Sequence, residues 1–402
     1  MASFMDAGAE VRLNQYFERI GVVLGNKKRR ESFAIYALGL LGDGERKSIE
    51  PIAARACAEP HGTDAAHQRL LHFATDSPWS DHGVRREAAR YALDAMTERE
   101  PVEAWIVDDT GFIKQGSHSV GVQRQYTGSA GKITNCQLGV SLSITTRTEH
   151  LPIDFELYLP HCWADDPERR AEARIPEDVP FKTKPTLALD MIRRACVSGV
   201  PRGVLLADTS YGNSSEFRKE VRSLELHYAV GVEPQTNVTL VDRESSPRGE
   251  PISVRDLAFT IRGRGGFRRC TWRKGTKKDL TARFALRRVV TSHDGPDAQW
   301  LLIEWRDGEA EPANYFLSTL PERMTKRQLI RIVMQRWRTE RVYEDLKGEL
   351  GLDHFEGRRF PGWHHHVSVA LCCYAFVIAE RVRRFPPSAG RPLEDGPHPV
   401  AA

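Results

Sequence analysis

Two short apolar segments that each end in aspartate constrain the fold of this chain more than any other feature. Residues 104–107 (AWIV) lead into Asp108 and Asp109, and residues 203–207 (GVLLA) lead into Asp208. Short apolar runs bounded by polar residues are typical of buried strands, and α/β folds place their sites at the edge where such strands end. The sequence therefore predicts an α/β fold with carboxylates at a sheet edge.

Composition is that of an ordinary globular chain. Its 402 residues are 40% hydrophobic and 28% charged, with a net charge of +4. No apolar run reaches the length of a membrane span, so no membrane partner is predicted. The N-terminus carries early acids and no apolar signal-peptide core, which favours a cytoplasmic location. The seven cysteines are scattered without a CxxC pair, so neither a disulfide framework nor a structural zinc site is predicted.

Changes in residue pattern divide the chain into five predicted segments. Apolar residues recur at helical spacing in the first segment, strands and helices alternate in the second and fourth, and the third is basic and rich in short strands. The last segment is rich in Pro and Gly and is predicted to be disordered. The segments are 1–100, 101–234, 235–312, 313–384 and 385–402.

A third carboxylate is predicted in the segment 326–350, which reads as one continuous helix capped by Thr325. Arg336, Glu340 and Lys347 are spaced by four and seven residues, which places all three on one helical face. Asp108, Asp208 and Glu340 together would supply hard oxygen ligands of the kind that suits two Mg²⁺ ions, with Mn²⁺ as an alternative. A salt-bridge ladder from Arg336 to Glu340 is the competing explanation for the helix.

Three long stretches resemble bacterial insertion-sequence transposases of the DDE superfamily. They are WIVDDTGFIKQGSHSVGVQRQYTGSAGKITNCQLGVSL, LLADTSYGNSSEFR and RWRTERVYEDLKGELGLDHFEGRRFPGWHHHVSVAL. The similarity is to the insertion-sequence-701 family, related to the insertion-sequence-4 group, and covers roughly residues 100 to 380. It implies an RNase H-like catalytic domain with a β-rich insertion between the second and third acids, preceded here by a helical N-terminal domain.

The resemblance also implies roles for individual residues. Arg336, Glu340 and Lys347 match the group's Tyr-x2-Arg-x3-Glu-x6-Lys signature, but Val333 replaces the tyrosine. By this match Glu340 is the third acid, and Arg336 and Lys347 contact DNA. The threonine that follows the two adjacent acids selects Asp108 as the first ligand. Asp109, the alternative, is then expected to point to the opposite side of the strand.

Several other acids are predicted to play no part in catalysis. Glu344 falls outside the spacing of the signature and is predicted to be solvated. Ordinary surface or loop positions are predicted for Asp154, Asp165, Asp166 and Asp345.

Basic and aromatic residues in three places are predicted to contact DNA. Between Arg262 and Arg288 eleven Lys and Arg stand against one acid, as expected of a hairpin that follows a phosphate backbone, with Trp272 able to stack on an unpaired base. An exposed basic hairpin without a ligand is the alternative. The predicted contacts are Trp272, Arg273, Lys274, Lys277 and Lys278 in this hairpin, Lys114, Arg124 and Tyr126 after the first acid, and Lys27, Lys28, Arg29 and Arg30 near the N-terminus.

The resemblance implies an Mg²⁺-dependent endonuclease and polynucleotidyl transferase that cuts double-stranded DNA at terminal inverted repeats and joins the ends to target DNA. A homodimer on DNA and association with the bacterial nucleoid are expected. Two alternatives remain open: a transposase-derived DNA-binding protein that does not cut, and a nuclease that never joins ends. The segment 42–48 (GDGERKS) lacks the spacing of a phosphate loop, so no nucleotide cofactor is predicted.

Overall fold

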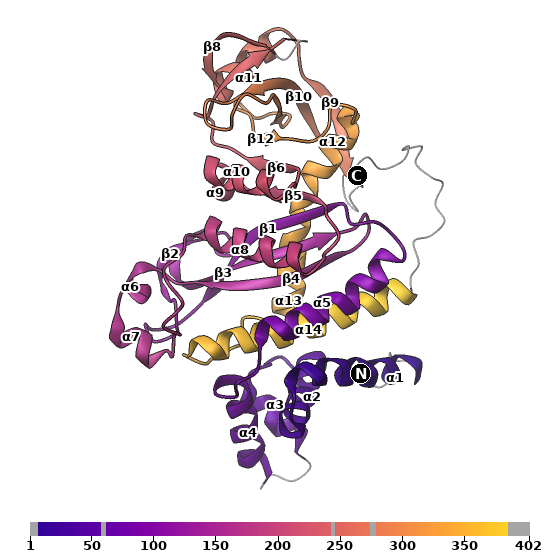
Figure 1. The fold of residues 1–402 in the computed structure, drawn as a ribbon, viewed down its shortest axis with the longest axis vertical. Coiled ribbons are helices and arrows are strands. Elements are labelled where there is room, and N and C mark those ends of the chain that lie inside the picture. The colour runs from indigo at the N-terminus through magenta and orange to yellow at the C-terminus, as the bar shows by residue number, and fades with distance from the viewer. Residues whose placement is uncertain (1–6, 58–61, 243–245, 274–278, 385–402) are drawn as a thin grey trace. The chain divides into compact units, whose positions relative to one another are not determined.

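The computed structural model of the chain describes residues 7–57, 62–242, 246–273 and 279–384 (Figure 1). The chain folds as two compact units. Of the described residues, the first unit contains 7–101, 108–191 and 338–384, and the second contains 102–107 and 192–337. The tail 385–402 and three predicted DNA contacts, Lys274, Lys277 and Lys278, lie outside the described residues.

A long strand, β3, lies at the centre of the sheet of the first unit and neighbours its other three strands. It pairs antiparallel with β4, from Leu138 opposite Tyr158 to Thr145 opposite His150. Its early residues pair with β2, and β1 is its other neighbour in the sheet. The last ten residues of β3 are all buried, as expected of a strand covered on both faces. The strands are β1 (Ala104–Ile113), β2 (Gln123–Thr127), β3 (Lys132–Thr145) and β4 (His150–Tyr158).

The helix α14 (Phe360–Arg384) is the core helix of the first unit. It lies beside α5 along β4, and also contacts α2 and α4 (Figure 1). By length and composition α14 could cross a membrane, but 89% of its most apolar window is buried within the protein. The other helices are α1 (Ala7–Leu24), α2 (Lys27–Leu41), α3 (Ile49–Ala56), α4 (Thr63–Thr75), α5 (Asp81–Thr97), α6 (His161–Ala164), α7 (Pro167–Glu172) and α13 (Arg338–Gly348).

The second unit is built on a mixed sheet with the order β1-β5-β6-β12-β11-β10-β7-β8, and β9 pairs with β10. Pairing from β1 to β6 is parallel, and the remaining pairs are antiparallel. Its strands are β5 (Val204–Ala207), β6 (Tyr228–Gly231), β7 (Asn237–Val241), β8 (Pro247–Ser253), β9 (Arg268–Arg273), β10 (Leu280–Val290), β11 (Gln299–Trp305) and β12 (Asn314–Ser318).

The helices of the second unit include α12, whose apolar side closes the hydrophobic core. Leu329, Ile330 and Val333 pack there with residues of β1, β5 and β10. The helices are α9 (Thr209–Gly212), α10 (Ser215–Ser223), α11 (Val254–Gly263) and α12 (Lys326–Val333); α8 (Lys184–Val197) begins in the first unit and ends in the second.

The mixed α/β architecture is confirmed, and two local predictions are wrong. The segment 326–350 is not one helix: α12 ends at Val333, a 3₁₀ segment covers Met334–Trp337, and α13 begins at Arg338. The basic segment is also not purely strand, because α11 ends at Gly263 and Arg262 therefore lies in a helix. The predicted cap at Thr325 is confirmed, since its side chain and that of Gln328 form a capping box.

Candidate functional site

The strand β1 directs its two adjacent aspartates to opposite faces, because side chains alternate along a strand. Asp108 shares a face with Thr110 and Phe112, and both of these residues contact Lys347 of α13. Asp108 is 8% exposed, and one of its carboxylate oxygens accepts a hydrogen bond from the Asp109 backbone N–H at 2.9 Å. Asp108 therefore lies on the side of β1 that α13 covers.

Asp109 occupies the other face of β1 and is held by an ion pair. Its Oδ2 lies 2.8 Å from the Lys184 Nζ at the start of α8, and the two side chains are 17% and 27% exposed. A carboxylate already paired with a lysine carries no surplus charge to attract a metal ion. The geometry therefore favours Asp108 as the first acid.

One stripe of α13 faces the sheet of the first unit. Tyr343 and Lys347 lie on it: the Tyr343 hydroxyl is 2.6 Å from Ser141 Oγ on β3, and the Lys347 Nζ reaches β1. Glu340 stands three residues before Tyr343 and seven before Lys347, so it belongs to the same stripe. Its side chain is exposed at the first turn of the helix. Helical spacing therefore puts Glu340 on the stripe of α13 that faces the side of β1 where Asp108 lies.

Two such carboxylates suit Mg²⁺ or Mn²⁺, because hard oxygen ligands are the donors these ions prefer. Glu344 lies one turn further along α13 and is largely exposed to solvent. It pairs with Arg341 at 3.6 Å, and both side chains are about 70% exposed. This surface position agrees with the prediction that Glu344 is solvated.

Arg336 is placed differently from its prediction. It lies in the 3₁₀ segment Met334–Trp337 rather than in the helix of Glu340 and Lys347, so helical spacing does not align it with them. The neighbouring Gln335 is buried and donates to the buried Glu103 carboxylate at 2.5 Å. Arg331 of α12 binds both oxygens of the same carboxylate at 2.9 Å. These contacts hold the end of α12 and the 3₁₀ segment against the start of β1.

The ammonium group of Lys347 is engaged by the protein itself. It donates to Thr110 Oγ1 at 2.9 Å, to the Gly111 carbonyl at 2.7 Å and to Ser129 Oγ at 3.3 Å. A lysine has three hydrogen atoms to donate, so this set uses its full capacity. Burial lowers the pKa of Lys347. These contacts favour a role in fastening α13 to β1 over direct contact with DNA.

Asp208 lies in the second unit, directly after β5. It is the N-cap of α9, and its Oδ1 accepts from the Ser210 backbone N–H at 2.9 Å. The residue is half-buried, and the Tyr211 that follows is fully buried. In the pairing of β1 with β5, Ile106 is opposite Leu206, and Asp208 comes two residues after Leu206.

The three predicted contacts after the first acid fall into two groups. Lys114 is half-buried, and its Nζ donates to the Phe355 carbonyl at 2.6 Å and to the Asp353 carbonyl at 3.4 Å. Burial lowers the pKa of Lys114, which agrees with a structural role. Arg124 and Tyr126, by contrast, are both exposed on the same face of β2.

The two described residues of the basic hairpin that were predicted to contact DNA both touch other parts of the second unit. Trp272 is half-buried and packs against the hydrophobic core of the second unit, which favours a core role over base stacking. Arg273 lies over the ring of Trp337, 3.3 Å from its centroid. Arg269 and Arg283 are paired across β9 and β10, remain largely exposed, and share Asp307 as their counter-ion.

The N-terminal basic cluster lies at the start of α2. Lys27, Lys28 and Arg30 are exposed, whereas Arg29 is half-buried and donates to Ser77 Oγ at 3.1 Å. Asn26 caps the helix by accepting from the Arg29 backbone N–H. The three exposed side chains are available to a ligand.

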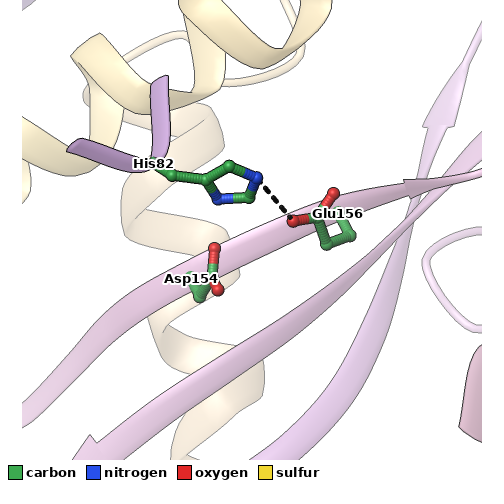
Figure 2. Close-up of side chains that lie close together, drawn as sticks. All are labelled: His82, Asp154 and Glu156. Carbon is green, nitrogen blue, oxygen red and sulfur yellow. Dashed lines mark ion pairs between the residues drawn. The ribbon is translucent and has the colours of Figure 1, made fainter. Parts of the chain in front are cut away.

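A partly buried charge cluster between α5, β4 and α14 was not predicted. His82, Asp154 and Glu156 have ligand atoms within 4.8 Å of one another, an arrangement that could hold a metal ion (Figure 2). The nearly fully buried guanidinium of Arg85, however, lies 2.9 Å from Asp154, 2.9 Å from Asp81 and 3.6 Å from Glu156. Asp154 is thus a buried partner of arginine, and its predicted surface position is wrong.

The hydrogen bonds of His82 argue against a metal ion in this cluster. An arginine can only donate, so His82 Nδ1 accepts from Arg85 at 2.7 Å and the neutral ring carries its hydrogen on Nε2. That Nε2 is the atom that faces Glu156, at 3.7 Å. Burial and the nearby Arg85 lower the pKa of His82. The cluster is therefore an ion network whose cation is Arg85. The signal in the sequence that could have revealed it is the pair of acids at alternate positions of β4.

The mixed α/β fold is consistent with a metal-dependent nuclease domain, and comparison with known proteins shows the family. The family described as DDE superfamily endonuclease matches residues 19–279, well over half of the chain, and the chain belongs to this family. This membership implies the use of a divalent metal ion.

A particular relative is also similar to the chain. The probable transposase for insertion sequence element IS701 from Microchaete diplosiphon is 29% identical over 215 residues, which is 53% of this chain and 52% of that protein. The chain thus spans about half the length of the curated relative it matches. The resemblance predicted from the sequence is confirmed.

Proposed function

We propose that this protein is a transposase that cuts DNA at the ends of its own insertion sequence and joins the freed 3′-hydroxyl ends to target DNA. The observation that supports the proposal most is that the α13 stripe of Tyr343 and Lys347, to which helical spacing assigns Glu340, lies on the Asp108 side of β1, whereas Asp109 pairs with Lys184 on the other face. Its DNA partners are the terminal inverted repeats and the target duplex. The protein acts in the cytoplasm, at the nucleoid.

Asp108, Asp208 and Glu340 are the proposed metal-ligating carboxylates. Ile106 of β1 and Leu206 of β5 are paired across the two strands, and Asp108 and Asp208 come two residues after them. Glu340 belongs to the stripe of α13 that faces β1 and β3. Two divalent ions, Mg²⁺ or Mn²⁺, would supply Lewis-acid stabilisation of an in-line displacement at phosphorus. The mixed α/β architecture is consistent with the proposed RNase H-like catalytic core.

The protein's own groups hold these acids in place. Lys347 fixes α13 to β1 through Thr110 and Gly111, and Tyr343 fixes it to β3 through Ser141. Glu340 therefore keeps one direction while its carboxylate remains open to solvent and substrate. Rigid support of this kind is what a metal-dependent site needs.

DNA contact is proposed for side chains on four elements: β2, the 3₁₀ segment, β9 and α2. Arg124 and Tyr126 on β2 lie in the first unit, and Arg336 and Arg273 lie in the second. The helices of residues 7–97 form the proposed end-binding domain, with Lys27, Lys28 and Arg30 at the start of α2, and residues 235–312 form the proposed insertion. A homodimer would hold both ends of the element.

The test is cleavage of a labelled duplex that carries one end of the insertion sequence that encodes the protein. The reaction is run once with Mg²⁺ and once with EDTA. Wild type is expected to cut and to join the 3′-hydroxyl to a second duplex, whereas Asp108→Ala, Asp208→Ala and Glu340→Ala bind without cutting. Binding without cutting by wild type would instead identify a DNA-binding descendant. Cutting without joining would identify a nuclease.

A further inference from the structure

The hairpin formed by β2 and β3 carries an exposed aromatic and an exposed aliphatic side chain side by side. Tyr126 and Ile133 are directly paired across the two strands, and they are 64% and 60% exposed. Single exposed apolar side chains are normal on a protein surface and need no explanation. A paired ring and aliphatic chain, both mostly exposed, form a small apolar platform.

This platform is fastened beside the strand that carries Asp108. Ser129, in the turn of the hairpin, has its Oγ 3.0 Å from Thr110 Oγ1 and 3.2 Å from the Gly111 backbone nitrogen, from which it accepts. Thr127 is 1% exposed and packs so closely on Gly111 that a Cβ there would meet its Oγ1 at 2.1 Å. The position of the platform is therefore set by contacts to the two residues that follow the candidate acid pair on β1.

The hairpin carries only positive charge, which favours an anionic ligand. Residues 123–137 contain Arg124 and Lys132 but no Asp or Glu, and both basic side chains are exposed. Arg124 lies on the same face of β2 as Tyr126. An apolar platform flanked only by cations fits a segment of single-stranded nucleic acid, whose phosphates attract the cations and whose base stacks on the ring.

We infer that Tyr126 and Ile133 form a binding site for one unpaired nucleobase of the DNA end, next to the phosphate that is cut. This inference rests on the proposed function and adds a subsite to it. Base stacking on an aromatic ring is tolerant of base identity, so the site would sense an unpaired base rather than read its sequence. Its effect would be to favour DNA whose end is locally opened.

The inference is tested by a double-mutant cycle that combines changes in the protein with changes in the DNA and compares the binding affinities. Binding of the full chain to the element's end would be measured by fluorescence anisotropy, with Ca²⁺ in place of Mg²⁺ so that the DNA stays uncut. One series of duplexes carries a single abasic nucleotide at each position around the cut. Wild type is expected to lose about tenfold in affinity at one position, in line with the usual value of a stacked base.

The protein variants show whether Tyr126 is responsible for that loss. Tyr126→Ala and Ile133→Ser are expected to bind the intact duplex about tenfold more weakly and to be insensitive to the abasic nucleotide at that position. Tyr126→Phe is expected to behave as wild type, because stacking needs the ring and not the hydroxyl. Val197→Ala, which removes an 89% exposed side chain from another element, is the matched control and should change nothing.

Three results would overturn the inference. The first is an abasic effect that persists in Tyr126→Ala, and the second is a Tyr126→Phe variant as defective as Tyr126→Ala, which would indicate a polar contact of the hydroxyl. The third is a wild type that shows no abasic effect. If wild type still cuts the DNA end in Mg²⁺, only this inference falls; if it neither binds nor cuts, the proposed function falls with it.

Discussion

Replacing each of the two adjacent aspartates of β1 in turn should separate catalysis from stability. Asp108→Asn removes a carboxylate on the side of β1 that α13 covers, whereas Asp109→Asn breaks the ion pair with Lys184 on the other face. Both changes keep the size of the side chain and replace a charge with an amide. We therefore expect Asp108→Asn to abolish cutting and Asp109→Asn to leave it within about threefold, a range worth less than 1 kcal/mol of activation free energy.

The magnitudes follow from the environment of each carboxylate. Loss of a metal ligand removes several kcal/mol of charge stabilisation in the transition state. At about 1.4 kcal/mol per factor of ten, about 4 kcal/mol corresponds to a rate reduced roughly a thousandfold. The Asp109–Lys184 pair is mostly shielded from solvent at 2.8 Å, but desolvation offsets much of its attraction, so its loss should cost about 1–2 kcal/mol of unfolding free energy.

The assay combines single-turnover nicking of the labelled DNA end with urea unfolding of each variant. Lys184→Met is the matched control, because it breaks the same ion pair from the other side. It should reproduce the stability loss of Asp109→Asn without a large effect on cutting. Loss of cutting in Asp109→Asn together with retention in Asp108→Asn would refute the reasoning and make Asp109 the first ligand.

Three further changes test the buried network, the anchor of α13 and the third acid. Arg85→Met should lower the unfolding free energy by about 3–5 kcal/mol, because it leaves buried carboxylates without their cation. Burial alone raises the pKa of Asp81, but Arg85 holds it well below its usual range, so the stability that Asp81 contributes is complete above about pH 4 and lost as the pH falls through its folded-state pKa. Without Arg85, the burial that raises the pKa of Asp81 is no longer offset by that cation, so the stability deficit, measured by urea unfolding, should be largest near pH 7 and shrink toward pH 4. Lys347→Met should lower the unfolding free energy by about 2–3 kcal/mol, because buried acceptors lose their donor. A plot of log Kd for DNA against log salt concentration should keep its slope in this variant. A slope reduced by about one would mean that Lys347 contacts a phosphate. Glu340→Gln should abolish cutting, and Glu344→Gln, one turn away on the same helix, should retain it; equal rates for the two would exclude Glu340 as the third acid.

The sequence predicted those features best that depend only on neighbouring residues, such as strand composition, alternation along a strand and helix capping. The apolar runs before Asp108 and Asp208 form parallel strands, as their composition indicates. Alternation along β1 correctly places Asp109 on the face opposite Asp108, because the period of a strand depends only on its backbone. The cap at Thr325 also follows from local hydrogen bonding.

Sequence failed where a partner distant in the chain decides the local structure. The periodic pattern of 326–350 does not show that the helix tightens at Met334–Trp337. Gln335 in that segment binds Glu103, which is 232 residues away along the chain. The ring of Trp272 likewise packs on a core assembled from several strands and α12. Neither contact has a local signal, so each could be found only in the folded chain.

The seven-residue spacing of Glu340 and Lys347 shows how the two kinds of information combine. Spacing correctly places both residues on one stripe of α13, but it does not say what that stripe meets. The match to the signature implied that Lys347 contacts DNA, whereas in the fold its ammonium group donates to Thr110, Gly111 and Ser129. Since Thr110 is only two residues from Asp108, the lysine that shares a stripe with Glu340 also binds the strand of the first acid. Lys347 therefore fastens α13, which carries the proposed third acid, to the strand of the proposed first acid, and a contact with DNA is not needed to explain its position.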